Sequence, residues 1–143
     1  MKTRRSLGLA GLHHVSFRVP DLDTSLALYR DTLGFPVKVA FTLDNLRFAM
    51  LETGNSGYIE LVEVKRAVRP GGDDEVIWHV ALCTDDLETS LHAVRKAGYE
   101  ITLPIRPLDL VNAATGKPFP IRVAFFRGPD GEVVELNVEA CGD

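Results

Sequence analysis

The sequence predicts an α+β protein built from two copies of one β-α-β-β-β module. Three observations support this prediction: a repeat at an offset of 65 residues, a second repeat at an offset of 75, and the same pattern of apolar residues in both copies. A chain of 143 residues is about the length of one domain. Because one module alone would struggle to bury a core, we expect the two to pack together in a single domain.

The two repeats have different offsets because the second copy is longer. Glu60, in the phrase Tyr58-Ile-Glu-Leu, falls on Glu135 in Val133-Val-Glu-Leu at an offset of 75. The ten additional residues lie between Tyr99 and Arg122, and we expect the Pro-rich segment 103–120 to be a loop that frames the mouth of a pocket. The identities at the offset of 65 are His14/His79, Val15/Val80, Asp21/Asp86, Leu22/Leu87, Thr24/Thr89, Ser25/Ser90 and Leu26/Leu91.

The first module, 9–64, starts with a strand at 12–19 that Pro20 ends. Asp21 is expected to cap a helix. Three strand-like runs follow at 37–43, 46–52 and 58–64, with turn residues between them. The apolar residues that recur at helical spacing are Leu22, Leu26, Tyr29 and Leu33.

The second module, 76–139, repeats this order after a linker at 65–75 that contains Arg69-Pro-Gly-Gly72. A strand at 77–83 precedes a helix with the apolar stripe Leu87, Leu91 and Val94, which Gly98 ends. Strands are expected at 99–103, 121–126 and 132–138.

Composition and charge exclude several classes of function. The chain has 16 Lys and Arg against 20 Asp and Glu, a net charge of −4, and so lacks the basic surface of a nucleic-acid-binding protein. No apolar stretch approaches the roughly 20 residues of a membrane span, and the first residues do not resemble a signal peptide. Cys83 and Cys141 follow no spacing pattern. We therefore expect a cytoplasmic protein that binds neither nucleic acid nor membranes.

Strand periodicity places four polar side chains on one side of the sheet. Because side chains alternate between the two faces of a strand, His14 and His79 lie opposite the apolar residues that pack against the helices. By the same rule, Glu60 and Glu135 also lie on the face away from the helices. A single strand histidine is usually an ordinary hydrogen-bonded residue, but packing does not require paired glutamates as well. Two imidazoles and two carboxylates at equivalent places form a ligand set for a divalent metal ion of borderline hardness.

The chain resembles the vicinal oxygen chelate superfamily, also called the glyoxalase/bleomycin-resistance/dioxygenase superfamily. The resemblance implies tandem βαβββ modules that form a cupped mixed sheet around a metal ion held by His14, Glu60, His79 and Glu135. It also implies a homodimer, with the cavity built either within one chain or across the dimer. The phrases that carry the resemblance are His14-Val-Ser-Phe-Arg-Val-Pro-Asp-Leu, Ala27-Leu-Tyr-Arg-Asp-Thr-Leu-Gly-Phe35, Ile59-Glu-Leu, His79-Val-Ala-Leu and Gly128-Pro-Asp-Gly-Glu-Val-Val-Glu-Leu136.

Within the superfamily, the His, Glu, His, Glu set resembles that of glyoxalase I, whose metal is usually nickel or zinc. Cobalt, manganese and iron are also compatible with these ligand types. Arg18, four residues after His14, matches an arginine that glyoxalase I uses on the glutathione carboxylate. Glyoxalase I usually has an Asn four residues after the second ligand and an Arg four residues before the third. This chain has Val64 and Glu75 at those positions, which argues against glutathione as the substrate.

The ligand set and the resemblance together predict a metal-dependent isomerase, lyase or epimerase of the glyoxalase type. A small substrate would chelate the metal through vicinal oxygens, and the reaction would move a proton through an enediolate. Glu135 is the expected general base, with Glu60 as the alternative. The expected substrate-binding residues are Arg18, Asn137, Lys117 and Arg122.

Two other functions stay open at the level of sequence. The first is a small-molecule-binding protein of the bleomycin-resistance kind, although those relatives generally lack the metal ligands. The second is an extradiol-type dioxygenase that binds Fe(II) through His14, His79 and Glu135. Tight, stoichiometric binding of an antibiotic by metal-free protein would favour the first, and oxygen consumption with a catechol would favour the second.

Overall fold

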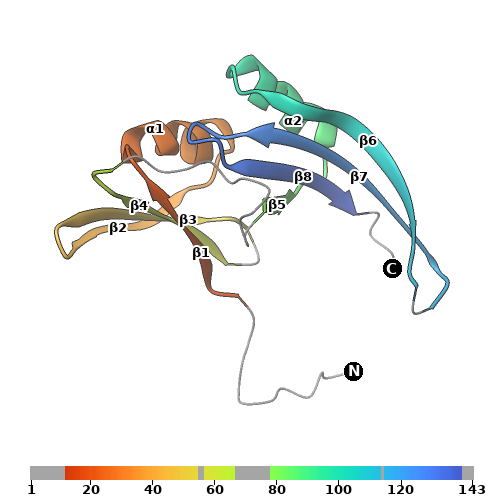
Figure 1. Cartoon of the computed structure of the whole chain (residues 1–143), viewed down its shortest axis with the longest axis horizontal. Coiled ribbons are helices and arrows are strands. Elements are labelled where there is room, and N and C mark those ends of the chain that lie inside the picture. The colour runs from red at the N-terminus through yellow and green to blue at the C-terminus, as the bar shows by residue number, and fades with distance from the viewer. Residues whose placement is uncertain (1–11, 55–56, 67–77, 114, 140–143) are drawn as a thin grey trace, which may run out of the picture.

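The structure, a computed structural model, describes residues 12–54, 57–66, 78–113 and 115–139. Two four-stranded sheets carry two helical segments, and the helices of both modules lie on the same side of the strands (Figure 1). The elements are β1 His14–Val19, α1 Leu22–Leu26, η1 Ala27–Thr32, β2 Val37–Leu43, β3 Leu46–Glu52, β4 Tyr58–Glu63, β5 Val80–Cys83, α2 Leu87–Lys96, β6 Ile101–Val111, β7 Pro118–Arg127 and β8 Val133–Glu139.

Both sheets have the same mixed topology. The strand order is β1-β4-β3-β2 in the first and β5-β8-β7-β6 in the second. In each sheet the first strand runs parallel to the last strand of its module, and the other pairings are antiparallel. The predicted α+β fold of tandem βαβββ modules is therefore confirmed. As a consequence of this order, β1 and β5 each lie at the edge of their sheet.

The hydrophobic core lies between the helices and the strands. Val80 and Leu82 pack against it, whereas Ala81 and Cys83 on the same strand are exposed, as strand periodicity predicts. The core includes residues of both modules, so the two modules share it. Its fully buried larger side chains are Tyr29, Phe126, Leu28, Leu51, Leu61, Leu87, Val19, Val94 and Val134.

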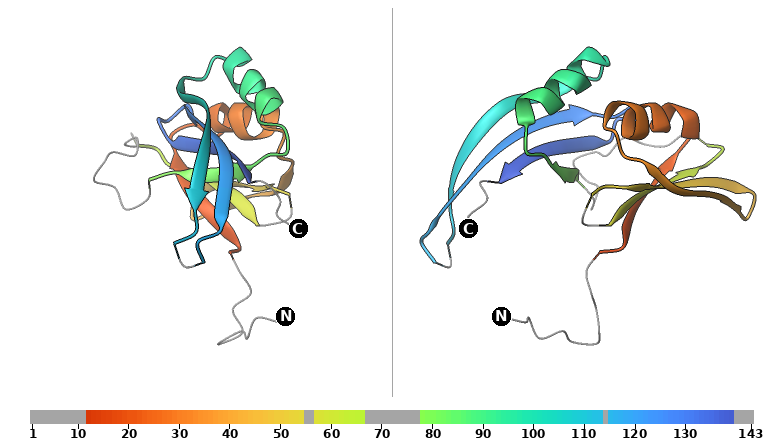
Figure 2. Two further views of the ribbon diagram at one scale, coloured as in Figure 1. Left: turned by 90° about the vertical axis from the view of Figure 1, so that its right-hand side faces the viewer. Right: turned by 180° about the vertical axis from the view of Figure 1, so that it is seen from behind.

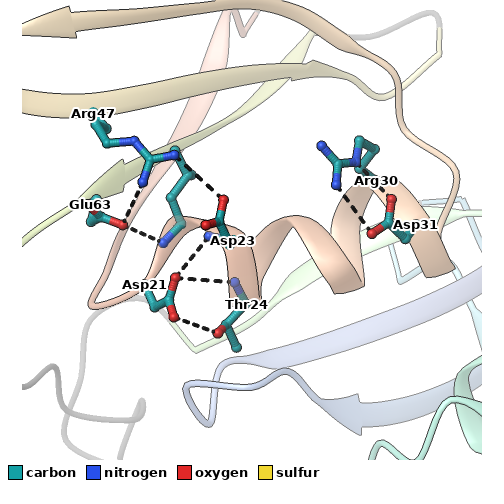
Figure 3. Close-up of polar contacts among 8 residues, drawn as sticks. Asp21, Asp23, Thr24, Arg30, Asp31, Arg47 and Glu63 are labelled. Carbon is teal, nitrogen blue, oxygen red and sulfur yellow. Dashed lines mark hydrogen bonds and ion pairs between the residues drawn. The ribbon is translucent and has the colours of Figure 1, made fainter.

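Polar contacts fix the start of α1 against the first sheet (Figure 3). The carboxylate of Asp21 accepts hydrogen bonds from the backbone N–H groups of Asp23 and Thr24, which confirms the predicted N-cap. The backbone N–H of Leu22 donates to Glu63 of β4 over 2.8 Å, and Arg47 of β3 bridges Glu63 and Asp23. In the second module, Asp86 caps α2 in the equivalent way.

After Leu26, the helix of the first module widens into a π-helical turn. The backbone N–H of Leu33 donates to the carbonyl of Leu28, five residues earlier, over 2.8 Å. Leu28 and Tyr29 are both fully buried. The predicted apolar stripe included Tyr29 but left out Leu28. The predicted apolar stripe assumes a regular α-helix and therefore does not include this wider turn.

The segment 103–120, which we expected to be a loop, is mostly strand. β6 and β7 form a long hairpin that extends beyond β8 as a curved arm (Figure 2). Prolines are tolerated because β6 is an edge strand, and because residues 118–120 of β7 pair only with β6. Within the described ranges, no helix is long and apolar enough to cross a membrane. Most of the predicted linker 65–75 falls outside the described residues, as does Cys141.

Candidate metal centre

The first candidate half-site joins His14 of β1 to Glu60 of β4. Nε2 of His14 lies 3.8 Å from Oε1 of Glu60. The hydroxyl of Ser16 donates a hydrogen bond to the same carboxylate oxygen over 3.0 Å, because Ser16 is the register partner of Glu60 across the parallel strands. The Glu60 side chain is only 13% exposed, and among the described residues neither Lys nor Arg pairs with it. A carboxylate this buried needs compensation for lost hydration, and the imidazole and hydroxyl provide part of it.

The second half-site repeats the first. Nε2 of His79, which directly precedes β5, lies 3.4 Å from Oε2 of Glu135 on β8. The Glu135 side chain is 12% exposed, and Ala81 is its register partner. Ala81 occupies the place that Ser16 has in the first module, so this carboxylate receives no hydroxyl from its neighbouring strand. The two glutamates thus have equivalent positions but different hydrogen-bonding surroundings.

His13, the residue before His14, also contacts the first half-site. Strand periodicity predicts His13 on the side of the core, but the structure leaves it exposed, with its Nδ1 2.9 Å from Nδ1 of His14. This contact occupies Nδ1 of His14 and leaves Nε2 directed at Glu60. Histidines that bind metals commonly have their second ring nitrogen held by a hydrogen bond. In the second half-site, Nδ1 of His79 is buried and has no partner among the described residues.

The donor atoms of each half-site are suited to a metal ion, but the two half-sites are separate within one chain. Two ligands of a zinc ion, each about 2.0–2.2 Å from it, lie about 3.0–3.5 Å apart. The separations of 3.4 and 3.8 Å are close to this value. Among the described residues, however, no group of three or more His, Cys, Asp or Glu is placed to hold a metal ion. Each half-site therefore supplies two suitable ligands and lacks the others.

Two cavities adjoin the half-sites. A cavity of about 520 Å³ covers the face of the second sheet that points away from the helices, and it contains His79 and Glu135. Another of about 590 Å³ lies between the two modules, with His14 and Tyr58 on one wall and Ala81 and Cys83 on the other. The cavity between the modules separates β1 from β5, so these two edge strands are not paired with each other.

The structure distributes the predicted substrate-binding residues unevenly. Arg18 is exposed on β1 on the same face as His14, and Asn137 is half-buried on β8 on the same face as Glu135. Lys117 is exposed at the turn of the β6–β7 hairpin. Arg122 lies on the other face of β7, where it pairs with Glu88 of α2. The alternation of β7 turns Arg122 toward the helices, so the structure does not bring it to Glu135.

A buried acidic cluster lies where the helix of the first module meets the turn before β8. Ser25 and Tyr29 are fully buried there and approach Asp130 and Glu132. Burial raises the pKa of Glu132 to about 7, and the neighbouring Asp130 carboxylate adds to the effect. Burial also raises the pKa of Asp130, and that of Tyr29 rises well above its ordinary value for the same reason. The only sequence signal for this cluster is the turn Gly128-Pro-Asp-Gly131, which indicates no charge burial.

Paired βαβββ modules with a matched His–Glu pair in each define the structural class of this protein. Residues 11–136 match the model of the Glyoxalase/Bleomycin resistance protein/Dioxygenase superfamily. The chain therefore belongs to that superfamily.

Individual relatives agree with this assignment. The chain is 29% identical over 133 residues to the lactoylglutathione lyase of Haemophilus influenzae, covering 86% of this chain and 88% of the relative. It is 27% identical to the trypanothione-dependent glyoxalase I of Leishmania major, with a TM-score of 0.62 over 94% of this chain and 86% of that one. A glyoxalase family protein from Enterococcus faecalis, 24% identical, shares the fold with a TM-score of 0.68 over 88% and 95% of the two chains.

Proposed function

We propose that this chain is a metal-dependent isomerase, lyase or epimerase of the glyoxalase type that acts on a small molecule with vicinal oxygens. The observation that carries the proposal is the equivalence of the two His–Glu pairs, at 3.8 and 3.4 Å. Similarity to the lactoylglutathione lyase of H. influenzae and to the glyoxalase I of L. major supports the reaction class. His14, Glu60, His79 and Glu135 would hold one divalent ion, nickel or zinc by ligand type.

We further propose that two copies of the chain complete each metal site. His14 and Glu60 of one copy would meet His79 and Glu135 of the other. Three features support this arrangement: the half-sites are separate within one chain, β1 and β5 are both edge strands, and large apolar side chains next to the two histidines are exposed. Leu12 is 83% exposed and Trp78 is 67% exposed. A homodimer would cover part of this exposed apolar surface and give each ion four ligands.

The chemistry of the site follows from its ligands. A divalent ion with two imidazole and two carboxylate ligands supplies a Lewis acid that makes the C–H bond beside a chelated carbonyl more acidic. The Glu135 carboxylate would accept that proton and return it to the adjacent carbon. Glu135 suits this role better than Glu60, because Ser16 holds Glu60 by a hydrogen bond whereas Ala81 leaves Glu135 without one. Arg18 and Asn137 lie on the same faces as the ligands and would bind polar groups of the substrate.

Elemental mass spectrometry of protein purified without chelator or affinity tag tests the metal site. We expect about one ion per chain in the wild type and its loss in the variant His14→Ala/Glu135→Ala. The variant His92→Ala/Glu100→Ala also removes one histidine and one glutamate, both exposed in the second module away from the site, and should keep its metal. Absence of metal after incubation with Ni, Zn and Fe salts would contradict the proposal. Iron in the protein together with oxygen consumption would favour a dioxygenase.

Proton transfer is tested by hydrogen–deuterium exchange in D₂O, with hydroxyacetone as a compound that has vicinal oxygens. NMR should show metal-dependent loss of the proton beside the carbonyl. Glu135→Gln should abolish the exchange, and His92→Ala should leave it unchanged. Exchange that persists in Glu135→Gln would assign the base to another residue, with Glu60 the first to test.

A further inference from the structure

The cavity beside His79 and Glu135 has an aromatic wall. Trp78 is 67% exposed, and its ring lies nearly parallel to that of Phe125, with an interplanar angle of 19° and centroids 6.4 Å apart. The imidazole of His79 stands edge-on to both rings. Leu103, Leu108 and Val123 extend the apolar surface. A flat unsaturated ring placed in the cavity would therefore stack or pack edge-to-face beside the metal ligand His79.

The same cavity contains an arginine that pairs with no acidic side chain in the part of the chain that the structure describes. Arg106 of β6 lines it and is exposed, and no carboxylate of the described residues pairs with it. Arg30, Arg47 and Arg122, by contrast, each form an ion pair. Arg127 also lines the cavity, but one of its N–H groups donates to the carbonyl of Gly131 over 2.8 Å. The planar guanidinium of Arg106 is suited to binding a carboxylate through two hydrogen bonds.

The strand register places the cation near the aromatic wall. Arg106 pairs with Val123, which is two residues before Phe125 on β7 and on the same face. Two residues along a strand span about 7 Å, so one small molecule can reach both. The cavity volume of about 520 Å³ is also within the range of small-molecule sites.

From this arrangement we infer that the substrate carries both an aromatic ring and a carboxylate, with Trp78 and Phe125 contacting the ring and Arg106 binding the carboxylate. The inference rests on the proposed function, because it takes this cavity as the substrate end of the metal site. It adds the substrate class, and it names three residues that the sequence pattern did not single out.

Trp78 is the single tryptophan of the chain, so its fluorescence reports directly on this cavity. We would titrate the full-length, chelator-treated protein with mandelate, which has a ring, a hydroxyl and a carboxylate. Hexahydromandelate has a saturated ring, and mandelamide has no charge. Mandelate should change the fluorescence and bind about 2–10-fold more tightly than hexahydromandelate. It should bind at least about 10-fold more tightly than mandelamide.

Variants assign each preference to a residue. Arg106→Gln should remove the preference for mandelate over mandelamide, and Phe125→Leu should remove the preference over hexahydromandelate. Arg95→Gln, which neutralises an exposed arginine on α2, should change neither. Equal binding of the three compounds, or no change in Trp78 fluorescence with mandelate, would overturn the inference.

The two proposals fail in different ways. A protein that binds no metal but prefers mandelate would contradict the proposed function and leave the assignment of the cavity intact. A protein that binds metal through the four ligands but does not distinguish the three compounds would contradict only the assignment of the cavity.

Discussion

Nε2 of His79 lies 3.4 Å from Oε2 of Glu135, diagonally across two parallel strands, and His14 and Glu60 repeat this relationship at 3.8 Å. The register explains the match, because each glutamate lies two residues beyond Tyr58 or its equivalent Val133, on the same face as the histidine. The ten additional residues of the second module are placed in the β6–β7 arm and leave this diagonal unchanged. Both modules thus present the same two ligands.

If two copies complete each site, complementary variants should restore each other. His14→Ala/Glu60→Ala and His79→Ala/Glu135→Ala should each bind almost no metal alone. A mixed dimer of the two has one site with all four ligands and one with none. Refolding them together should therefore restore metal to a fraction of the dimers, measured by elemental analysis. A mixture that stays free of metal would place the complete site within one chain.

Ser16→Ala should weaken metal binding about 10-fold, because the hydroxyl that holds Glu60 over 3.0 Å is lost. Competition with a chelating dye measures the dissociation constant. Ala81→Ser is the reciprocal variant: it adds a hydroxyl beside Glu135 and should strengthen metal binding while slowing deuterium exchange. Unchanged affinity in both variants would mean that the neighbouring strand does not orient the carboxylates.

The stability of the protein should fall between about pH 4.5 and pH 7, because burial raises the pKa of Glu132 from 4.5 to about 7. Within that window the unfolded chain releases a proton that the folded chain retains. The contribution of Glu132 to the free energy of unfolding is therefore complete below pH 4.5 and is lost as the pH rises through about 7. The loss is about 3 kcal/mol. The Asp130 carboxylate faces the same group and opposes its ionisation.

Urea unfolding at a series of pH values measures this effect. Glu132→Gln should flatten the profile across the window, since the amide keeps the shape of the side chain without its titration. Glu100→Gln, an exposed glutamate before β6, should follow the wild type. Parallel profiles for wild type and Glu132→Gln would contradict the assignment.

Phe126→Ala should reduce the free energy of unfolding by about 3–5 kcal/mol, because Phe126 is fully buried in the shared core. Phe119→Ala is the matched control on the same strand, where the side chain is 41% exposed near the tip of the arm. Chemical denaturation should show a much smaller change for it. Comparable losses in the two variants would mean that the arm is packed against another surface in solution.

The sequence by itself determined the parts of this protein that depend on local patterns. Periodicity placed His14 and His79 opposite the core, and the repeat placed Glu60 and Glu135 at equivalent positions. Asp21 was recognisable as an N-cap because capping involves only neighbouring residues. These features need no knowledge of how distant segments meet.

The tertiary structure decided the features that depend on contacts between segments distant in the sequence. It turned Arg122 toward Glu88, brought Arg106 into the cavity with Phe125, and buried Glu132 beside the helix of the other module. It also decided that the Ser16 hydroxyl donates a hydrogen bond to Glu60, whereas Ala81, the register partner of Glu135, offers no hydroxyl. The physical reason is that alternation specifies the face of a strand but not which strands pair, how far they extend or how two modules pack.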